Sequence, residues 1–543
     1  MNAFKGDWRQ LQNILILLLV FAFCLYVPSL FYDGFADDDV YLAFANRFLR
    51  ESHWSDLHQF FLRPANPIEF LPLRDLSYWL DFRLYGDELN GFHATNLLWY
   101  AASGLATFWL FRELILLCRP AWAARKTVLS LCGAVVFVVH PAHVEVVAWI
   151  ASRKDLIGGT LGFIALALLT RALRHHWSGR QMVLAAVMLF AACFGKASAM
   201  TGILLVTVLI GMEWSRRAEV RCGKKLGFLL LFWILVGVAF VIHLNVGASS
   251  GIRIENHPGL LATLDRASRI FAALTGILLF PYPMRFYYDV YQLGEWHWLV
   301  SASAALLLIA SLCVLWRKRS LWALGVAMTF APFIVYLQLM PFTSWSLASE
   351  RFVYASVAGL ALVLIDLFGR IDRPKEFLGL LLVIVLPCAV IAWSRIGEWG
   401  DFPKQLLFRE YASQPDFHNA IRDRIVFKLL PEERYAEAAA LAGQVQRTYA
   451  TAALFSLIEA EQAYRQMSEA KSLSFGDNGG VLKGRFCDAV ARLRSATRDG
   501  YAQMPNEPDV SYNNILRTLD QQLNFRYGAG KSICVGVVSR QSG

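Results

Sequence analysis

The feature that most constrains the fold of this chain is a succession of long apolar segments separated by short polar ones. A helix crosses the hydrocarbon core of a bilayer with about 20 predominantly apolar residues. Charged residues make up only 17% of the 543 residues, against about 25% in soluble globular domains. This composition excludes a soluble enzyme, a disordered chain and a disulfide scaffold, and it predicts an all-α, polytopic membrane helical bundle with about eleven transmembrane helices. The apolar segments cover residues 13–32, 91–111, 127–145, 155–170, 181–195, 200–214, 226–246, 298–316, 321–339, 352–368 and 376–394.

Lysine and arginine collect in every second loop between these segments, which is the positive-inside pattern of membrane proteins. The pattern places the N-terminus in the cytoplasm and, after eleven crossings, the C-terminus on the far side. The net charge of +10 therefore reflects membrane topology, and nucleic acid is not expected as a partner. The absence of an Asn-x-Ser/Thr sequon argues against a eukaryotic secretory setting. We expect a bacterial inner (cytoplasmic) membrane, with the C-terminal region in the periplasm. The cation-rich loops lie at residues 112–126, 171–180, 216–225, 317–319 and 370–375.

Two long segments interrupt this pattern on the outer side. Residues 33–90 are acidic and rich in aromatic side chains, and their helical spacing predicts short helices that lie on the membrane surface. Residues 246–297 contain several glycines and prolines, so they are expected to be irregular in part. The apolar stretch at 268–282 is short, which predicts a re-entrant or interfacial helix.

The composition becomes polar and mixed in charge after Trp393. We therefore expect a transmembrane domain over residues 1–395 and a small soluble helical domain over residues 396–543. Alanine-rich helical pairs in the second part indicate stacked hairpins of the tetratricopeptide type. Its two cysteines, Cys487 and Cys534, leave two alternatives open in an oxidising compartment, a disulfide or two free thiols.

Three consecutive carboxylates, Asp37, Asp38 and Asp39, follow the first apolar segment. Such a cluster suits a place where a cation or an acceptor hydroxyl is handled. A carboxylate whose pKa is raised by like charges is able to act as a general base. The alternative is a solvated acidic loop or an N-cap for the next helix. On charge alone, this alternative is the better supported one.

A second group of polar residues follows the third apolar segment. His140 and His143 stand three residues apart, and Glu145 follows them. A His-x-x-His spacing beside a carboxylate is able to hold a metal, but Pro141 disrupts a regular helical face. A structural or substrate-contacting role is therefore preferred over metal binding.

Cations at the ends of apolar segments are candidates for phosphate binding. Arg153 and Lys154 precede one such segment, and Lys196 lies between two others. The alternative for these residues is an anchoring role, with long side chains that reach the membrane surface. Glu350 and Arg351 precede a further apolar segment, and either they pair with each other or Arg351 faces a phosphate.

Arg285 and Asp289 lie within an aromatic and proline-rich stretch at residues 280–291. Such a stretch is able to line a groove for a lipid tail or a sugar ring. The alternative is an interfacial belt of aromatic side chains.

Taken together, these segments resemble the GT-C superfamily of multi-pass glycosyltransferases. They are most similar to the transmembrane and tetratricopeptide-repeat O-mannosyltransferase family and its bacterial relatives. The most specific match is the stretch "VHPAHVEVVAWIASRKDL", because it contains the His-Pro-x-His-x-Glu-x-Val and Arg-Lys-Asp elements of that family. The resemblance covers about residues 10–400. Its matching stretches are residues 37–41, 72–100, 139–156, 280–291 and 349–359.

The resemblance implies transfer of a sugar, such as mannose, from a polyprenyl-phosphate donor to a hydroxyl acceptor, Ser or Thr of a protein, at the outer membrane face. It implies Asp38 as the general base, with Asp39 second and Asp37 third. It also implies cations that stabilise the departing lipid phosphate. The candidates for that phosphate are Arg153, Lys154, Lys196 and Arg351, and those for other substrate contacts are His140, His143, Glu145, Arg285 and Asp289.

Other functions stay open at this level. The acceptor is alternatively a lipid or a polysaccharide. A transporter or flippase of lipid-linked sugars is a different class, and it predicts inverted repeats with charges near the middle of the membrane. A scaffold that docks partners on its C-terminal helices is a third. No cofactor is required by the pattern. A divalent metal is compatible with the three aspartates, but no second ligand cluster accompanies them.

Overall fold

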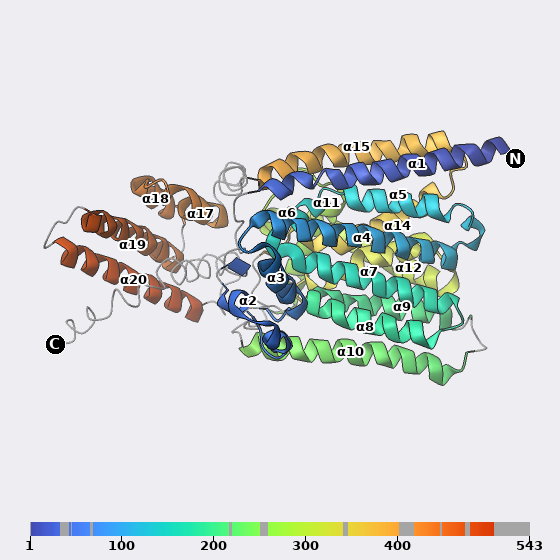
Figure 1. Ribbon diagram of the computed structural model, residues 1–543, viewed down its shortest axis with the longest axis horizontal. Helices are drawn as coiled ribbons and strands as arrows, with labels where there is room; N and C mark the ends of the chain where they lie inside the picture. The colour runs from blue at the N-terminus through green and yellow to red at the C-terminus, as the bar shows by residue number, and fades with distance from the viewer. Residues whose placement is uncertain are drawn as a thin grey trace.

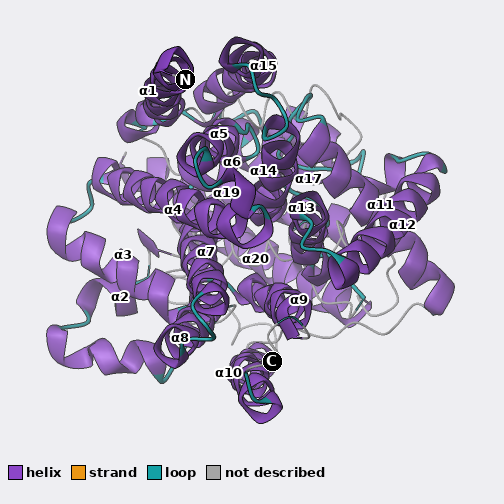
Figure 2. Cartoon of the chain, turned by 90° about the vertical axis from the view of Figure 1, so that its right-hand side faces the viewer, coloured by secondary structure: helices purple, strands orange, loops and turns teal. Residues whose placement is uncertain are grey.

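The computed structural model describes residues 2–32, 43–44, 46–65, 69–214, 216, 220–249, 259–339, 346–400, 418–445, 448–472 and 478–503. Over these ranges the chain is helical and contains no strand (Figure 2). Most helices run side by side in one bundle, and the helices α17 to α20 extend from one end of it (Figure 1). The predicted all-α class is thus confirmed for the part of the chain that the structure describes.

Eight helical segments in the described ranges are long and apolar enough to cross a membrane. Three further apolar helices are shorter: α5 (Lys126–Val139), α8 (Gly179–Gly195) and α13 (Leu321–Phe330), which continues as a 3-10 segment to Val335. Each of the eleven apolar segments expected from the sequence overlaps one of these helices. The eight long segments contain α1 (Asn2–Cys24), α4 (Leu89–Cys118), α7 (Arg153–Arg174), α9 (Gly202–Trp214), α10 (Cys222–Ser249), α12 (Trp296–Arg317), α14 (Tyr354–Phe368) and α15 (Pro374–Trp399). The segments with α9 and α14 reach this length through the 3-10 turns that precede these helices.

Helix α7 lies inside the bundle, whereas α10 and α12 lie at its edge (Figure 2). About 72% of the span that contains α7 is buried, compared with 17% for α10 and for α12. The exposed side chains of the two outer helices are largely apolar, for example Leu230 and Leu306. Apolar side chains remain exposed along a whole helix when hydrocarbon rather than water surrounds it. The difference in burial therefore fits a bundle embedded in lipid.

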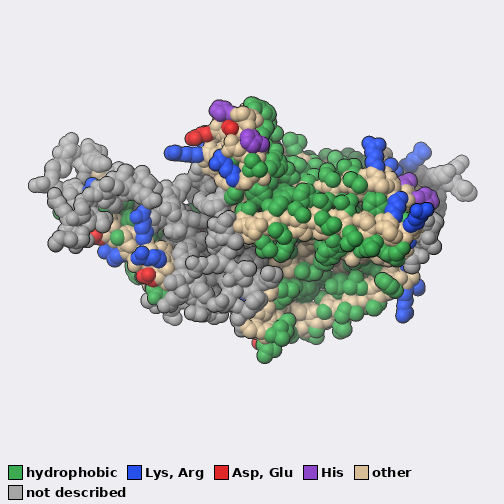
Figure 3. All heavy atoms as spheres, turned by 90° about the horizontal axis from the view of Figure 1, so that it is seen from below, with side chains coloured by type: hydrophobic (Ala, Val, Ile, Leu, Met, Phe, Trp, Pro, Cys, Tyr) green, Lys and Arg blue, Asp and Glu red, His purple; other side chains and the backbone are tan. Residues whose placement is uncertain are grey.

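The cation-rich loops gather at the end of the bundle where the N-terminus lies, opposite α17 to α20 (Figure 1; Figure 3). Several of their arginines pair with buried carboxylates of neighbouring helices. Arg119 contacts Asp366 at 2.9 Å, and Arg319 pairs with Glu213 of α9. The charge pattern read from the sequence therefore corresponds to one physical end of the molecule.

Short helices cover the opposite end of the bundle. The first outer segment forms α2 (Arg47–Glu51), a 3-10 segment (Trp54–Phe61) and α3 (Pro72–Tyr85). The side chain of Asn46 caps α2 by accepting from two backbone N–H groups. Beyond α5, Pro141 separates it from the short helix α6 (His143–Ala148).

Helix α11 (Leu260–Leu279) includes most of the stretch that was expected to be re-entrant or interfacial. Its first half carries three charged residues, Asp265, Arg266 and Arg269. It is not among the helices apolar enough to cross a membrane. Whether it re-enters the bilayer stays a prediction.

The C-terminal helices are α17 (His418–Arg424), continued by a π-helical turn to Leu429, α18 (Tyr435–Ala442), α19 (Thr448–Ser472) and α20 (Asn478–Gln503). Helices α19 and α20 pack along each other as a hairpin (Figure 1). They share a hydrophobic core that is separate from that of the bundle. The C-terminal region is therefore helical over the residues that the structure describes, while the stacked hairpins of the repeat type and the domain boundary at residue 395 stay predictions. Cys487 is disulfide-bonded.

Candidate functional site

The three predicted catalytic aspartates, Asp37, Asp38 and Asp39, lie outside the described residues. One aromatic residue on each side of their segment, Tyr32 and Phe44, contacts the start of α4. The ring of Tyr32 meets that of His93 with centroids 5.5 Å apart. The ring of Phe44 meets that of Phe92 at 4.7 Å.

A cavity of about 80 Å³ opens between α7, α9 and α14. Its polar lining includes Asp155, Lys196 and Arg351, which come from three distant parts of the chain. Apolar side chains such as Phe163 and Leu205 continue the lining along the helices. The cavity thus combines cations with an apolar wall.

Three glycines of α7, Gly158, Gly159 and Gly162, line one wall of this cavity. A Cβ atom at Gly159 would stand 2.5 Å from the ring of Tyr354, and one at Gly158 would stand 2.8 Å from Cβ of Lys196. These two positions therefore accept no side chain without displacing a neighbour. A Cβ atom at Gly162 meets nothing within 4 Å, so this glycine leaves the wall open.

Lys196 follows the end of α8 and reaches back to the first turn of α7. Its Nζ atom pairs with Oδ1 of Asp155 and lies 5.8 Å from the ring centroid of Tyr336 and 5.9 Å from that of Phe352. Among the described residues, Asp155 is its one hydrogen-bond partner. An ammonium group has three N–H donors, so two of them stay available to a ligand.

Arg351 is held by Glu145 of α6. The Glu145 carboxylate accepts from the Arg351 guanidinium, from the Arg351 backbone N–H at 2.8 Å and from the hydroxyl of Ser349 at 2.9 Å. The Arg351 guanidinium lies 5.1 Å from the ring centroid of Trp149. These contacts fix both the backbone and the side chain of Arg351 at the cavity.

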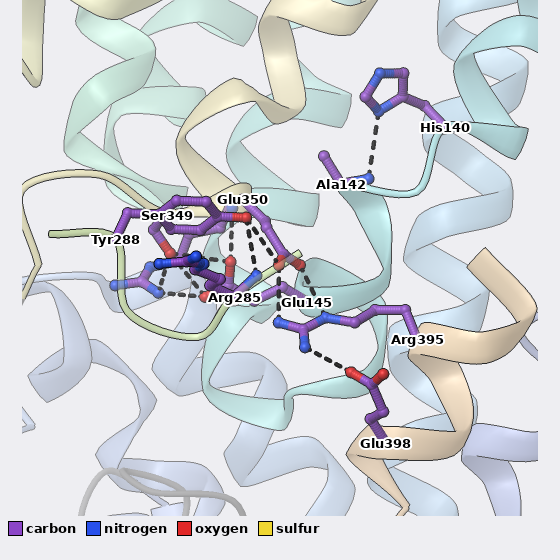
Figure 4. A network of polar contacts seen from close by, with 10 residues as sticks. His140, Ala142, Glu145, Arg285, Tyr288, Ser349, Glu350, Arg395 and Glu398 are labelled. Atoms are coloured by element: carbon purple, nitrogen blue, oxygen red, sulfur yellow. Dashed lines mark hydrogen bonds and ion pairs between the residues drawn. The ribbon is translucent and has the colours of Figure 1, made fainter. Parts of the chain in front are cut away.

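Glu350, the neighbour of Arg351, has partners on other elements of the bundle. Its carboxylate accepts from Arg395 of α15 at 2.8 Å, and Arg395 also pairs with Glu398 at 2.7 Å. Figure 4 shows how Glu145, Tyr288, Glu350 and Arg395 converge from separate elements. Glu350 therefore has a partner on α15, and Arg351 has a partner on α6.

Arg153 and Lys154 lie beside the cavity in contacts of their own. Arg153 is fully buried and bonds Asn96 at 2.7 Å and the carbonyl of Phe92 at 2.8 Å, and it pairs with Asp81 at 2.5 Å. Lys154 pairs with Glu69 at 2.6 Å. Of the four cations predicted for a phosphate, the cavity lining contains Lys196 and Arg351.

Glu69 also pairs with Arg74 at 2.6 Å. Burial by itself raises the pKa of a carboxyl group. At Glu69, however, the charges of Lys154 and Arg74 outweigh burial, so its pKa lies well below the usual range. Glu69 therefore stays ionised and holds the two cations in place.

The two predicted histidines are buried. His140 Nε2 contacts the carbonyl of Leu278 at 3.0 Å, and His143 Nδ1 contacts the hydroxyl of Tyr100 at 3.0 Å. In Figure 4, His140 stands apart from the network around Glu145. No group of three or more His, Cys, Asp or Glu side chains suited to a metal occurs among the residues searched, which are those described.

Arg285 and Asp289 lie on the loop that follows α11. The backbone N–H of Arg285 donates to the hydroxyl of Tyr288 at 3.1 Å. The Asp289 carboxylate accepts from the backbone N–H of Tyr291 at 2.9 Å, which caps a short 3-10 turn. Neither residue is among those that line the cavity.

Several residues of this site were not selected from the sequence. The Gly-Gly-x-x-Gly spacing of α7 was a readable signal, since small residues on an apolar helix allow close approach or leave space. Ser349, Tyr336 and Phe352 carried no such signal. Their contacts depend on which helices meet.

No protein-family profile matches the chain. Over 357 residues the chain is 20% identical to protein O-mannosyl-transferase F38B6.6 of Caenorhabditis elegans. This alignment covers 61% of this chain and 47% of that protein. Over 135 residues it is 32% identical to protein O-mannosyl-transferase Tmtc1 of Drosophila melanogaster, covering 25% of this chain and 14% of that protein. The chain therefore spans less than half the length of either relative.

These matches show a distant similarity, over much of the chain, to the GT-C protein O-mannosyltransferases that carry transmembrane and tetratricopeptide-repeat regions. The family resemblance drawn from the sequence motifs is confirmed at this level.

Proposed function

We propose that this protein is a GT-C-type glycosyltransferase. It moves a sugar, a hexose such as mannose, from a polyprenyl-phosphate donor to a hydroxyl acceptor, Ser or Thr of a protein. The observation that carries the proposal is the cavity in which Lys196 and Arg351 meet beside an apolar wall. The distant similarity to protein O-mannosyltransferases supports the same reaction class.

The donor has two chemically different parts that the cavity matches. Its phosphodiester carries one negative charge, which suits the N–H donors of Lys196 and the nearby guanidinium of Arg351. Its isoprenoid chain is apolar, which suits a wall made by Phe163, Leu166 and Leu205. A soluble nucleotide-sugar donor has no use for such a wall.

Three helices add to the attraction for an anion. Helices α7, α9 and α14 begin at Arg153, Gly202 and Tyr354, and their first turns contribute to the cavity lining. The N-terminus of a helix carries a partial positive charge and unpaired N–H groups. A phosphate between these ends is stabilised most when its charge rises, which happens as the glycosidic bond breaks.

In the proposed reaction, the acceptor oxygen forms a bond to the anomeric carbon while the bond from that carbon to the phosphate oxygen breaks. Asp38 takes the proton of the acceptor hydroxyl, with Asp39 and Asp37 as the second and third choices. The electron pair of the broken bond leaves with the phosphate, giving polyprenyl phosphate. Lys196 and Arg351 stabilise that charge, and Arg153 and Lys154 act by holding the adjacent helices.

We propose a topology with eleven crossings, the N-terminus in the cytoplasm and the C-terminal helices in the periplasm of a bacterial inner membrane. The cation-rich loops at the N-terminal end support this orientation. The disulfide at Cys487 supports an oxidising environment for α20. The bilayer contacts the apolar faces of α10 and α12.

The test is turnover of a panel of polyprenyl-phosphate sugars by purified protein, measured as release of polyprenyl phosphate with and without Ser/Thr peptides. We expect Asp38→Asn to abolish release while the protein still inserts and folds. The matched control is Asp87→Asn, an exposed carboxylate of the same outer segment that pairs with Arg50. Retained turnover in Asp38→Asn contradicts the proposed base. Movement of labelled lipid without release of polyprenyl phosphate indicates a flippase instead.

A further inference from the structure

One carboxylate that lines the cavity, that of Asp155, has a buried oxygen without a hydrogen-bond partner. Asp155 is only 4% exposed, and its Oδ1 atom pairs with Lys196. Its Oδ2 atom is buried and makes no hydrogen bond. A buried oxygen left unsatisfied costs about 1–3 kcal/mol, and more when it is charged. Such an atom needs an explanation beyond packing.

A role of Asp155 as counter-ion to Lys196 accounts for the contact of Oδ1 but not for the burial of Oδ2 without a partner. Two other carboxylates that hold cations nearby, Glu145 and Glu69, use both of their oxygens. Glu145 binds Arg351 and Ser349 with both oxygens, and Glu69 binds Lys154 and Arg74 with one oxygen each. Asp155 is the carboxylate that lines the cavity itself. Its second oxygen is therefore placed to receive a donor from a ligand.

The chemistry of the proposed ligand limits which of its groups is able to donate a hydrogen bond to Oδ2. A carboxylate oxygen accepts hydrogen bonds and repels a phosphodiester, so the phosphate is not its partner. An isoprenoid chain has no N–H or O–H group. The hydroxyl groups of the transferred sugar are the donors next to the phosphate, which Lys196 would hold immediately beside Asp155.

We propose that Asp155 selects the donor sugar, by accepting a hydrogen bond on Oδ2 from one of its hydroxyl groups while Oδ1 holds Lys196. The inference rests on the proposed function and adds to it the residue that determines the specificity for the sugar. Lys196 links binding of the phosphate to binding of the sugar, because its ion pair with Asp155 fixes the carboxylate relative to the phosphate. Sugars that lack the hydroxyl leave Oδ2 buried and unpaired, which is how polar sites reject an analogue.

The experiment measures kcat/KM for the parent donor and for its four monodeoxy analogues (2-, 3-, 4- and 6-deoxy). For the wild-type protein we expect one analogue to react about 10- to 150-fold more slowly than the parent, the range for a hydrogen bond to a charged group. Equal rates for all five donors overturn the proposal without any variant.

Asp155→Asn tests the residue. The variant keeps an oxygen for Lys196 and replaces Oδ2 by an amide that donates, so the discrimination should fall to within about threefold. A counter-ion role alone predicts the same loss on every donor and an unchanged ratio, and that result also overturns the proposal. Glu69→Gln is the control, because it disturbs an ion pair beside the cavity and should leave the ratio unchanged.

Binding measurements separate this inference from the proposed reaction. If the wild-type protein turns over no donor, the proposed function fails. Competition of the same five donors against labelled polyprenyl phosphate then reports on Asp155 directly. Preference for the parent that disappears in Asp155→Asn supports the inference. Equal competition by all donors, or preference that survives in Asp155→Asn, overturns it.

Discussion

Two groups of cations lie at the same end of the bundle, and they differ in how many of their N–H donors already have partners. Arg153 is fully buried and bonds an amide, a backbone carbonyl and a carboxylate. Lys196 is partly exposed to a cavity and contacts one carboxylate oxygen. Both come from polar positions at the ends of apolar segments. A positive charge at such a position is therefore not enough to assign a ligand to the residue. A cation is able to bind a ligand only if some of its N–H donors have no partner in the protein.

The largest effect is expected from a substitution of Arg153, the cation whose guanidinium nitrogens all have partners in the protein. Arg153→Met leaves Asp81 buried without its cation, and such a change costs about 3–5 kcal/mol. We expect a lower yield of folded protein and a clear drop in the temperature of unfolding in detergent. A variant of normal stability that has lost only its activity would place Arg153 with the ligand-binding cations.

The next largest effect is expected from a substitution of Lys196, the cation with unused N–H donors at the cavity. Lys196→Gln keeps a polar side chain near Asp155 but removes the charge, so we expect kcat/KM for the donor to fall about 10- to 100-fold, from loss of one or two charge-assisted bonds. Because the variant also leaves Asp155 buried without its cation, we expect the unfolding temperature to fall as well. A large loss of stability with unaltered donor kinetics would reverse the roles of the two groups.

A third substitution tests the apolar wall rather than the charge. Gly162→Leu adds a side chain on the wall of the cavity, at a position where a Cβ atom meets nothing within 4 Å. We expect about a tenfold rise in KM for a long-chain donor and a smaller rise for a donor with a short chain. The control is Gly237→Leu on α10, where a Cβ atom is equally unobstructed. Equal KM values for Gly162→Leu and the control would show that the chain lies elsewhere.

The smallest effect concerns Lys154, which is 19% exposed and paired with Glu69. Partly exposed ion pairs contribute about 1 kcal/mol. Lys154→Gln should therefore lower stability slightly and leave donor KM within about twofold. Thermal unfolding and initial-rate kinetics on the same preparation check both parts, and a tenfold change in KM would assign Lys154 to the phosphate after all.

Much of the fold was predictable because hydrophobic periodicity is local. The eleven apolar segments all correspond to helices, and the Ala-rich residues after 429 form the helices α18 and α19. The start of α11 was placed too late, because its first turns carry Asp265 and Arg266 and do not look apolar. Among the cations, Lys196 and Arg351 were selected together with Arg153 and Lys154, and nothing in their local sequence separated the two pairs.

The sequence by itself determined that this chain forms apolar helices, that its positive charge lies in every second loop, and that a few cations stand at helix ends. These properties depend on residues close together in the chain. Only the tertiary structure decided which cations keep unused donors. The partners of Arg153 come from α3 and α4, and those of Arg351 come from α6 and the segment before α14. Hydrogen bonds satisfied across such sequence distances are set by how helices pack, and no local pattern encodes them.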